Sequence, residues 1–286
     1  KVKAFITMGE KTIVSLAPAY LGIFDYDKPG QVVDALLRLG FSEVRETAEG
    51  AAYVTEAYAR LLEEGQMKNI ISTCCPSVNE LVEKYYPELV EYMAPVVSPM
   101  IAHGKLIKSM YGPDVKVVFV GPCIAKKQEA EGDDRTTGFV DAVLNFEEIE
   151  SWLQERDISI RECEGKQPTN PDPKVNRLYP VTSGVISSVL AKKKVDSYKK
   201  IFVDGIEDCR EVFEDMKKGL IDGCFIEANM CEGGCVKGPA VNKLHISKYK
   251  ATMVIEEQVE KQDPAYSQLA GNIDISKHFR SERIQD

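Results

Sequence analysis

The sequence predicts an α/β fold of two lobes, each with a small, mainly parallel sheet flanked by helices. Segments of buried-strand character alternate with amphipathic helical segments along most of the chain. Three times, a short apolar strand ends where a cysteine-containing motif begins. With 286 residues, the chain is long enough to bury a substantial core in one large domain or two lobes.

The individual elements follow from periodicity and from Pro and Gly. A strand is predicted over 11–16, where Ala17-Pro18-Ala19 ends it. Helices are predicted over 31–39, ending at Gly40, and over 51–62. Ser98 and Pro99 form a typical N-cap and first helical position for a helix reaching about 111. The same patterns predict a helix over 78–86 and strands over 69–72, 115–120, 200–203 and 223–226.

Composition excludes several classes of function. Apolar residues make up 44% of the chain and charged residues 28%, as in ordinary globular proteins. The net charge of −9 argues against nucleic acid or an anionic membrane surface as a partner. Apolar runs such as 117–120 are far too short to cross a bilayer. We therefore expect neither nucleic-acid binding nor membrane association.

The chain is expected to divide into a first lobe over 1–113 and a second over 114–286, together forming one domain. The stretch 162–176, rich in Pro, Asn, Asp and Lys, is the best candidate for a surface connection. The sequence starts at Lys1 without Met, so we expect a fragment of a longer chain. No secretory signal is visible, and eight cysteines are too few for a disulfide scaffold, which predicts reduced thiols in the cytoplasm.

Four of the cysteines lie in three short motifs. These are Cys75 in Cys-Cys-Pro, Cys123 in Gly-Pro-Cys, and the pair Cys231 and Cys235 in Cys-Glu-Gly-Gly-Cys. Soft thiolates suit an iron–sulfur cluster or zinc. Taken singly, Cys-Cys-Pro is usually a strand-to-helix turn with buried thiols, and Gly-Pro-Cys is a turn. The pair Cys231 and Cys235 alone could be a chance spacing, a redox pair or half a zinc site. Because parallel strands present ligands beyond their carboxyl ends, all four cysteines are expected to meet in a cleft between the lobes.

The surroundings of these cysteines resemble the catalytic domain of the FeFe hydrogenases. The resemblance covers nearly the whole chain and preserves the order of the motifs. It is carried by Cys-Cys-Pro, Tyr-Tyr-Pro-Glu-Leu and Ser-Pro-Met within 74–100, Gly-Pro-Cys-Ile-Ala-Lys-Lys-Gln-Glu at 121–129, Tyr-Pro-Val-Thr-Ser-Gly-Val at 179–185, and Asn-Met-Cys-Glu-Gly-Gly-Cys-Val-Lys-Gly-Pro at 229–239.

The resemblance implies an H-cluster, which is a 4Fe–4S cubane joined to a diiron subcluster with CO, cyanide and a dithiolate bridge. The implied cubane ligands are the four motif cysteines, and Cys235 would bridge to the diiron unit. Lys126 matches the lysine that reaches a cyanide ligand, and Cys74 matches a proton-relay thiol. The positions implied to line the same pocket are Ala17, Pro18, Ser98, Met100, Pro122 and Asn229.

The implied reaction is reversible oxidation of H₂ to protons and electrons. Implied partners are a ferredoxin-like electron-transfer domain or protein and the maturation proteins that supply the diiron unit. No ferredoxin-type Cys-x-x-Cys-x-x-Cys run occurs in this sequence. The remaining thiols, which match no motif, are expected to be ordinary buried cysteines: Cys163, Cys209 and Cys224.

Departures from the family pattern point to a slow or hydrogen-sensing member. Val78 replaces the usual Trp, and Gly121 replaces a Met. The usual Gln and Met of the pocket are Met100 and Asn229. In the proton path, Ala94 stands at the serine position, while the glutamate position falls near 53–54, with Glu56 one turn further on. Methyl and aryl groups do not relay protons as a hydroxyl and a carboxylate do.

Two other classes stay open from the residues alone. One is an iron–sulfur assembly-type relative of the hydrogenases that binds a 4Fe–4S cluster without diiron catalysis. Loss of Lys126 or of the Cys74-Cys75 pair would favour it, and the chain retains both. The other is a zinc-stabilised α/β binding module, since four thiolates also suit zinc. Visible absorption separates these two, because zinc thiolate is colourless.

Overall fold

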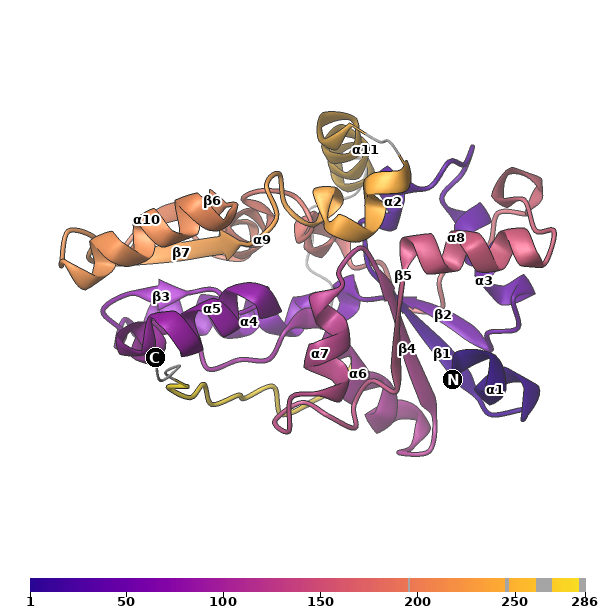
Figure 1. The fold of residues 1–286 in the computed structure, drawn as a ribbon, viewed down its shortest axis with the longest axis horizontal. Helices are drawn as coiled ribbons and strands as arrows, with labels where there is room; N and C mark the ends of the chain where they lie inside the picture. The colour runs from indigo at the N-terminus through magenta and orange to yellow at the C-terminus, as the bar shows by residue number, and fades with distance from the viewer. Residues whose placement is uncertain (195, 245–246, 261–268, 283–286) are drawn as a thin grey trace.

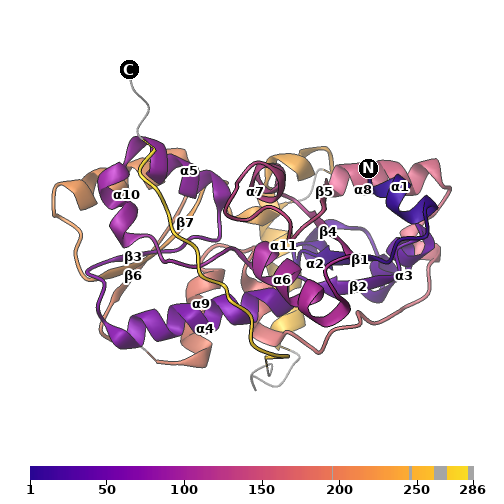
Figure 2. The ribbon, with the colours of Figure 1, turned by 90° about the horizontal axis from the view of Figure 1, so that it is seen from below.

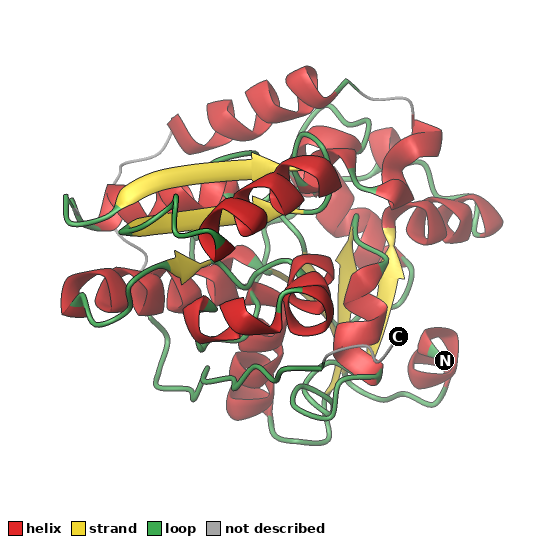
Figure 3. Ribbon diagram, turned by 60° about the vertical axis from the view of Figure 1, so that its left-hand side comes forward, coloured by secondary structure: helices red, strands yellow, loops and turns green. Residues whose placement is uncertain are grey.

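The computed structural model describes residues 1–194, 196–244, 247–260 and 269–282. It contains two parallel sheets with helices packed around them (Figure 1). Parallel neighbours require crossover connections, and here helices supply most of them. The alternation of strands and helices along the chain therefore produces the predicted α/β fold, with helices flanking small parallel sheets (Figure 3).

The larger sheet has the strand order β2-β1-β4-β5. Its strands are β2 (Glu43–Glu46), β1 (Thr12–Leu16), β4 (Lys116–Gly121) and β5 (Ala142–Asn145), and every pair is parallel. β1 is buried along its whole length, as expected for a central strand covered on both faces. The strands predicted over 11–16 and 115–120 are thus confirmed as β1 and β4.

β2 has a charged sequence but a buried position. Arg45 is 5% exposed and bonds Glu49, while Glu46 is 1% exposed and bonds Arg177. Buried charges are tolerated when each has a partner of opposite sign. This pairing explains why a strand without apolar alternation lies inside the molecule.

The smaller sheet has the strand order β3-β7-β6. Its strands are β3 (Ile70–Ile71), β7 (Cys224–Asn229) and β6 (Lys199–Asp204), all parallel. β7 is buried throughout, whereas β6 is partly exposed at the edge. The three predicted strands over 69–72, 200–203 and 223–226 are confirmed, each within a few residues of its expected bounds.

Helices cover both sheets. Figure 1 shows α6 (Pro99–Tyr111) on one side of the larger sheet and α3 (Gly30–Arg38) and α8 (Phe146–Glu155) on the other. α5 (Pro76–Tyr85) and α10 (Ile206–Lys217) share an apolar core with β7. The remaining helices are α1 (Val2–Thr7), α2 (Tyr20–Ile23), α4 (Ala48–Glu64), α7 (Ala125–Glu131), α9 (Gly184–Lys192) and α11 (Lys248–Glu260).

Two long segments connect the sheets. α4 packs against α6 beside the larger sheet and against α9 beside the smaller one. It ends at Gly65, whose φ of 62° gives a left-handed C-cap. The described C-terminal segment crosses the molecule (Figure 2, yellow), where Lys277 N bonds Pro95 O at 3.0 Å and Glu282 N bonds Glu83 O at 2.7 Å.

The expected boundary between residues 113 and 114 does not separate the sheets. β4 and β5 follow that boundary but lie beside β1, while β3 precedes it and lies beside β7. The chain crosses between the sheets more than once, so no single cut divides them. The connection predicted over 162–176 does join the helix beside β5 to the helix before β6.

Among the residues that the structure describes, no helix is both long enough and apolar enough to cross a membrane.

Candidate metal and catalytic centre

The predicted cysteines lie at the carboxyl ends of strands from both sheets. Cys75 follows β3 and occupies the N-cap position of α5, with φ −97° and ψ 109°. Cys123 lies two residues beyond β4, and Cys231 lies two residues beyond β7. Cys235 begins a short 3₁₀ turn after Gly233 and Gly234, whose φ values are 86° and 79°. Positive φ suits glycine, so this pair permits the tight return of the chain.

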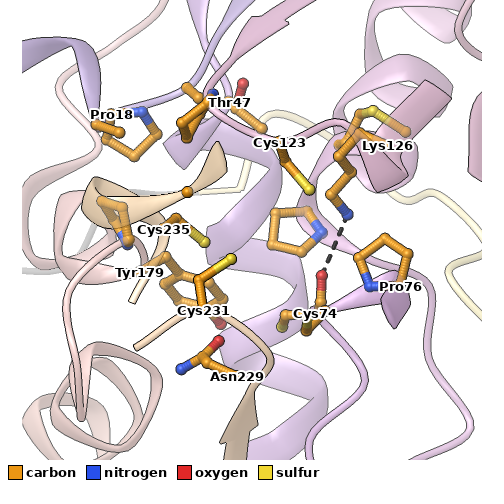
Figure 4. Close-up of a pocket in the computed structure, with 18 of the residues that line it drawn as sticks. Pro18, Thr47, Cys74, Pro76, Cys123, Lys126, Tyr179, Asn229, Cys231 and Cys235 are labelled. Carbon is orange, nitrogen blue, oxygen red and sulfur yellow. Dashed lines mark hydrogen bonds between the residues drawn. The ribbon is translucent and has the colours of Figure 1, made fainter. Parts of the chain in front are cut away.

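The four cysteines line one cavity of about 110 Å³ (Figure 4). The labelled sulfur atoms of Cys123, Cys231 and Cys235 point into the same space. Cys75 also lines it. Within the described part of the chain, no three His, Cys, Asp or Glu side chains are placed to hold a single metal ion. The thiols instead surround a space.

The pKa values of the thiols reflect how close the four cysteines lie to one another. Burial raises the pKa of Cys231 to about 12, and the charges of Cys75 and Cys123 add to the effect. Burial raises the pKa of Cys235 well above its ordinary value, as do the charges of the other three motif cysteines. Four neighbouring thiolates therefore need added positive charge. A 4Fe–4S cubane held by four cysteine thiolates fits this donor set.

Cys74 borders the same cavity on the side of α4. Its Sγ lies 3.3 Å from the hydroxyl of Tyr58, which is itself fully buried. Burial raises the pKa of Cys74 to about 12, against the hydrogen bond from Tyr58 and the charge of Lys126. The raised pKa favours the protonated thiol at neutral pH.

Lys126 brings a buried cation to the cavity wall. Its Nζ donates to the carbonyl oxygen of Cys74 at 3.1 Å and to Glu129 at 2.5 Å. Burial opposes the charged form, but the charges of Glu129 and Cys123 outweigh it and raise the pKa of Lys126. A charged donor is thus available to an anion in the cavity.

Most of the other predicted pocket residues also line the cavity, namely Ala17, Pro18, Met100, Pro122 and Asn229. The expectation that Ser98 lines the cavity is corrected, because Ser98 is not among the residues that form the cavity wall. Its hydroxyl accepts from Ile101 N at 3.5 Å and caps α6.

Several lining residues were not found by sequence reasoning. Thr47 follows β2, so the rule that ligands collect beyond strand ends would have indicated it had β2 been recognised. Tyr179 and Pro180 come from the family-like stretch 179–185. Val185, Met230 and Gly238 also line the cavity and lie within the family-like stretches 179–185 and 229–239, while Ser77 and Phe119 have no comparable signal.

Gly121, where the family has Met, has a structural explanation. A Cβ at this position would lie 2.5 Å from the ring of Phe119 and 3.0 Å from Cβ of Ala17. The Phe119 ring therefore occupies the space that a side chain at residue 121 would need. In this chain, Phe119 forms that part of the wall.

At the altered proton-path positions the side chains are apolar, and the nearby carboxylate of Glu56 is paired with a lysine. Ala94 is 0% exposed and belongs to the apolar core. Val54 is also 0% exposed, and Glu56 forms an ion pair with Lys192. Of the cysteines outside the motifs, Cys163, Cys209 and Cys224 are all buried free thiols, as expected.

Comparisons with known proteins identify the family to which the chain belongs. A model of the iron-only hydrogenase large subunit, C-terminal domain, matches residues 10–239. Iron hydrogenase 1 of Clostridium pasteurianum is 27% identical over 90% of this chain and 56% of its own length. The periplasmic Fe hydrogenase large subunit of Nitratidesulfovibrio vulgaris is 28% identical over 73% of this chain and 61% of its own length. The chain thus spans a little over half of each relative.

Solved structures agree in fold. A structure from a study of how oxygen inactivates FeFe hydrogenase superposes with a TM-score of 0.74 at 18% identity, covering 96% of this chain and 95% of that one. An apo FeFe hydrogenase from Chlamydomonas reinhardtii superposes with a TM-score of 0.68 at 18% identity, covering 86% and 84%. The family match extends over most of the sequence, and the chain belongs to the iron-only hydrogenase large-subunit family, of which it forms the C-terminal domain.

Proposed function

We propose that this chain is the H-cluster domain of a hydrogenase. In this proposal Cys75, Cys123, Cys231 and Cys235 would hold a 4Fe–4S cubane, and Cys235 would connect it to a diiron subcluster with CO, cyanide and a dithiolate bridge. When bound, that cofactor supplies the interconversion of H₂ with protons and electrons. The observation that carries the proposal is that these four thiols share one cavity with Cys74 and Lys126.

The protein's own side chains have distinct tasks in this site. Cys74 holds a proton at Sγ beside the cavity, where its raised pKa keeps the thiol protonated. The Lys126 ammonium orients an anionic group through charge-assisted hydrogen bonds. Apolar side chains exclude water from the remaining wall, among them Pro18, Pro76, Pro99, Met100 and Phe119.

We further propose that this is a slow or hydrogen-sensing member working in the anaerobic cytoplasm. The support is the apolar character of Ala94 and Val54 at the proton-path positions. Electrons would pass to a ferredoxin-like domain or protein, and maturation proteins would supply the diiron unit. Turnover at rates typical of fast hydrogenases would contradict the sensing role.

Infrared spectroscopy tests the proposed site. The chain is reconstituted anaerobically with iron and sulfide, loaded with a synthetic diiron precursor, and recorded at about 1,800–2,150 wavenumbers, where metal-bound CO and cyanide absorb. We expect sharp bands that disappear in Cys235→Ser and persist in Cys224→Ser. The second variant is the matched control, because Cys224 is buried in the core of α5 and α10 and does not line the cavity.

The same experiment addresses the assembly-type alternative. A cubane absorbance without CO or cyanide bands would overturn the diiron assignment and leave a 4Fe–4S protein that shares the fold. A colourless protein that binds zinc in place of iron would overturn both.

A further inference from the structure

A continuous line of buried polar side chains extends from the cavity wall toward α4. The hydroxyl of Thr47 lies 2.8 Å from the hydroxyl of Ser15, and Ser15 Oγ lies 2.7 Å from His103 Nδ1. His103 Nε2 lies 3.1 Å from Glu49 Oε2. Three successive hydrogen bonds therefore join four side chains from β1, α4, α6 and the residue between β2 and α4.

The inner end of this line is the cavity itself. Thr47 lines the cavity, and Figure 4 shows it beside Pro18 and Cys123. Ser15 and His103 are 0% exposed, and Thr47 is 4% exposed. Bulk water consequently does not reach the middle of the line.

The outer end lies at a small hollow on another side of α4. Glu49 lines this hollow together with Tyr53, Pro171 and Leu269, and Leu269 is 39% exposed. Its volume of about 10 Å³ gives room for about one water molecule. The buried hydroxyl of Tyr53 lies near the backbone of Ala270 and Gly271, but it makes no hydrogen bond of ordinary geometry within the described segments. A water at this point would satisfy that hydroxyl and contact Glu49.

The charges around His103 favour a neutral ring. Burial lowers the pKa of His103, against the hydrogen bond and charge of Glu49 and the charge of Glu46, while Arg45 adds to the lowering. Burial also opposes ionisation of Glu49, but hydrogen bonds from His103 and Arg45 outweigh it and lower the pKa of Glu49. A neutral imidazole accepts a proton at one nitrogen and donates from the other.

The arrangement of serine, histidine and carboxylate has the composition of a hydrolase triad, but it does not suit that chemistry. A nucleophilic serine must reach its substrate. Ser15 is completely buried in β1, and its hydroxyl is shared between His103 and Thr47. Proton transfer is compatible with this burial, because it moves a proton along existing hydrogen bonds.

We propose that Glu49, His103, Ser15 and Thr47 form a proton-transfer chain between the hollow beside Tyr53 and the cysteine-lined cavity. The proposal rests on the function proposed above, because a site that releases or consumes protons requires such a chain. It also offers a carboxylate close to the altered family position, since the usual glutamate is expected near 53–54 and Glu49 lies about one turn earlier on α4.

Each transfer takes up one proton from water at Glu49 and delivers one proton to the cavity at Thr47. In the His103 tautomer that carries its proton on Nδ1, a proton from water reaches Glu49 and passes to Nε2, while the Nδ1 proton moves to Ser15 Oγ. Ser15 gives its hydroxyl proton to Thr47, and Thr47 releases its own into the cavity. The ring then carries its proton on Nε2. The reverse sequence moves one proton from the cavity outward to water and restores the first tautomer, so the chain exchanges one proton at a time and involves no electron transfer.

The first test does not depend on the cofactor. The protein contains three histidines, so selective ¹⁵N labelling gives few ring signals, and His103→Gln identifies those of His103 by their loss. The measurement compares exchange of the His103 ring N–H with water against exchange of the backbone amides of β1. A conducting chain predicts ring exchange at least about tenfold faster than those amides, which require larger opening of the fold. Equal rates would overturn the proposal.

The second test uses the reconstituted protein loaded with the diiron precursor. Ser15→Ala and Thr47→Val interrupt the chain, and we expect each to slow H₂-dependent proton exchange by about tenfold or more. Thr12→Val is the matched control, because Thr12 is also buried in β1 but bonds the carbonyl of Glu10. Unchanged exchange rates in both chain variants would overturn the proposal.

Infrared bands and melting temperature separate transfer from structure. Interruption of a proton chain leaves both close to those of the parent, whereas a purely structural role shifts the bands or lowers the melting temperature in step with the rate. Such a parallel loss in both variants would overturn the proposal. If the parent itself showed no CO or cyanide bands, the proposed function would fail, and ring exchange would still report on the chain separately.

Discussion

The Nζ atom of Lys126 lies 3.1 Å from the carbonyl oxygen of Cys74 and donates a hydrogen bond to it. Lys126 belongs to α7, beyond β4, whereas Cys74 follows β3 in the smaller sheet. This contact therefore joins the strand ends of the two sheets across the cavity. The backbone of Cys74 thus fixes the position of the Lys126 ammonium at the cavity wall.

Replacement of Lys126 by Met should selectively impair retention of the diiron unit. The variant loses the cationic donor at the cavity and leaves Glu129, which is 4% exposed, without its buried partner. Loss of one member of a buried pair typically costs about 3–5 kcal/mol of unfolding free energy. We expect weak CO and cyanide bands with the cubane absorbance retained. Lys127→Met is the control, since Lys127 forms a half-exposed pair with Glu148. Equal loss in both variants would contradict the assigned role.

The adjacent residues Cys74 and Cys75 should behave differently. Cys75→Ala removes a proposed cubane ligand, so the visible iron–sulfide absorbance should fall strongly after reconstitution. Cys74→Ala keeps all four ligands and removes the proton-bearing thiol, so absorbance should persist while H₂ turnover falls by about 10²-fold or more. Absorbance and turnover are measured on the same samples. Loss of the cluster in Cys74→Ala alone would reverse the two assignments.

Glu227 should make the unfolding free energy depend on pH. Burial raises the pKa of this carboxyl to about 7, from 4.5, against hydrogen bonds from the backbone at Ile186 and from Asn229. The folded state therefore binds a proton that the unfolded state releases. The resulting stability is complete below about pH 4.5 and is lost as the pH rises through about 7.

Denaturant titration of the parent and of Glu227→Gln between pH 4.5 and 8 checks this sign. The difference between the two proteins should change by at most about 1.4 kcal/mol per pH unit, with the parent losing more as the pH rises. Gln keeps an oxygen that accepts from Ile186 N, which lies 2.9 Å from the carboxylate. A difference that is constant over this range would show that Glu227 does not titrate there.

Arg135 should hold the C-terminal segment to the rest of the molecule. Its guanidinium bonds both oxygens of Glu83, which is 1% exposed and also accepts from Arg280 N at 2.8 Å. Arg135→Met leaves Glu83 buried without its cation, so we expect the free energy of unfolding to fall by about 3–5 kcal/mol. Hydrogen exchange at the Lys277 amide should become faster.

Arg280→Met provides the comparison for this prediction. The Arg280 side chain is 55% exposed and pairs with a more exposed Asp134. Exposed pairs of this kind contribute about 0–1 kcal/mol. Comparable destabilisation in the two variants would show that the buried pair of Arg135 and Glu83 has no special role.

The central strands and the cysteine motifs were determined by local sequence. β1, β4 and β7 have apolar runs that end at Pro, Gly or a cysteine motif, and burial on both faces of a parallel sheet demands such runs. The four cysteines were predictable for the same reason, because strand ends collect ligands at one edge of a sheet. The direction of Lys126 toward Cys74 did not follow from spacing along the chain.

Tertiary structure alone decided which strands became neighbours. The pairing of β3 with β7 joins residues about 150 apart in the sequence, so a boundary at 113 could not be recognised as wrong from local patterns. β2 is charged, and its burial depends on Arg177 and Glu49, which come from other elements. The line from Glu49 through His103 and Ser15 to Thr47 likewise exists only after β1, α4 and α6 pack together. Hydrogen bonds between distant side chains depend on three-dimensional distance, which no local pattern encodes.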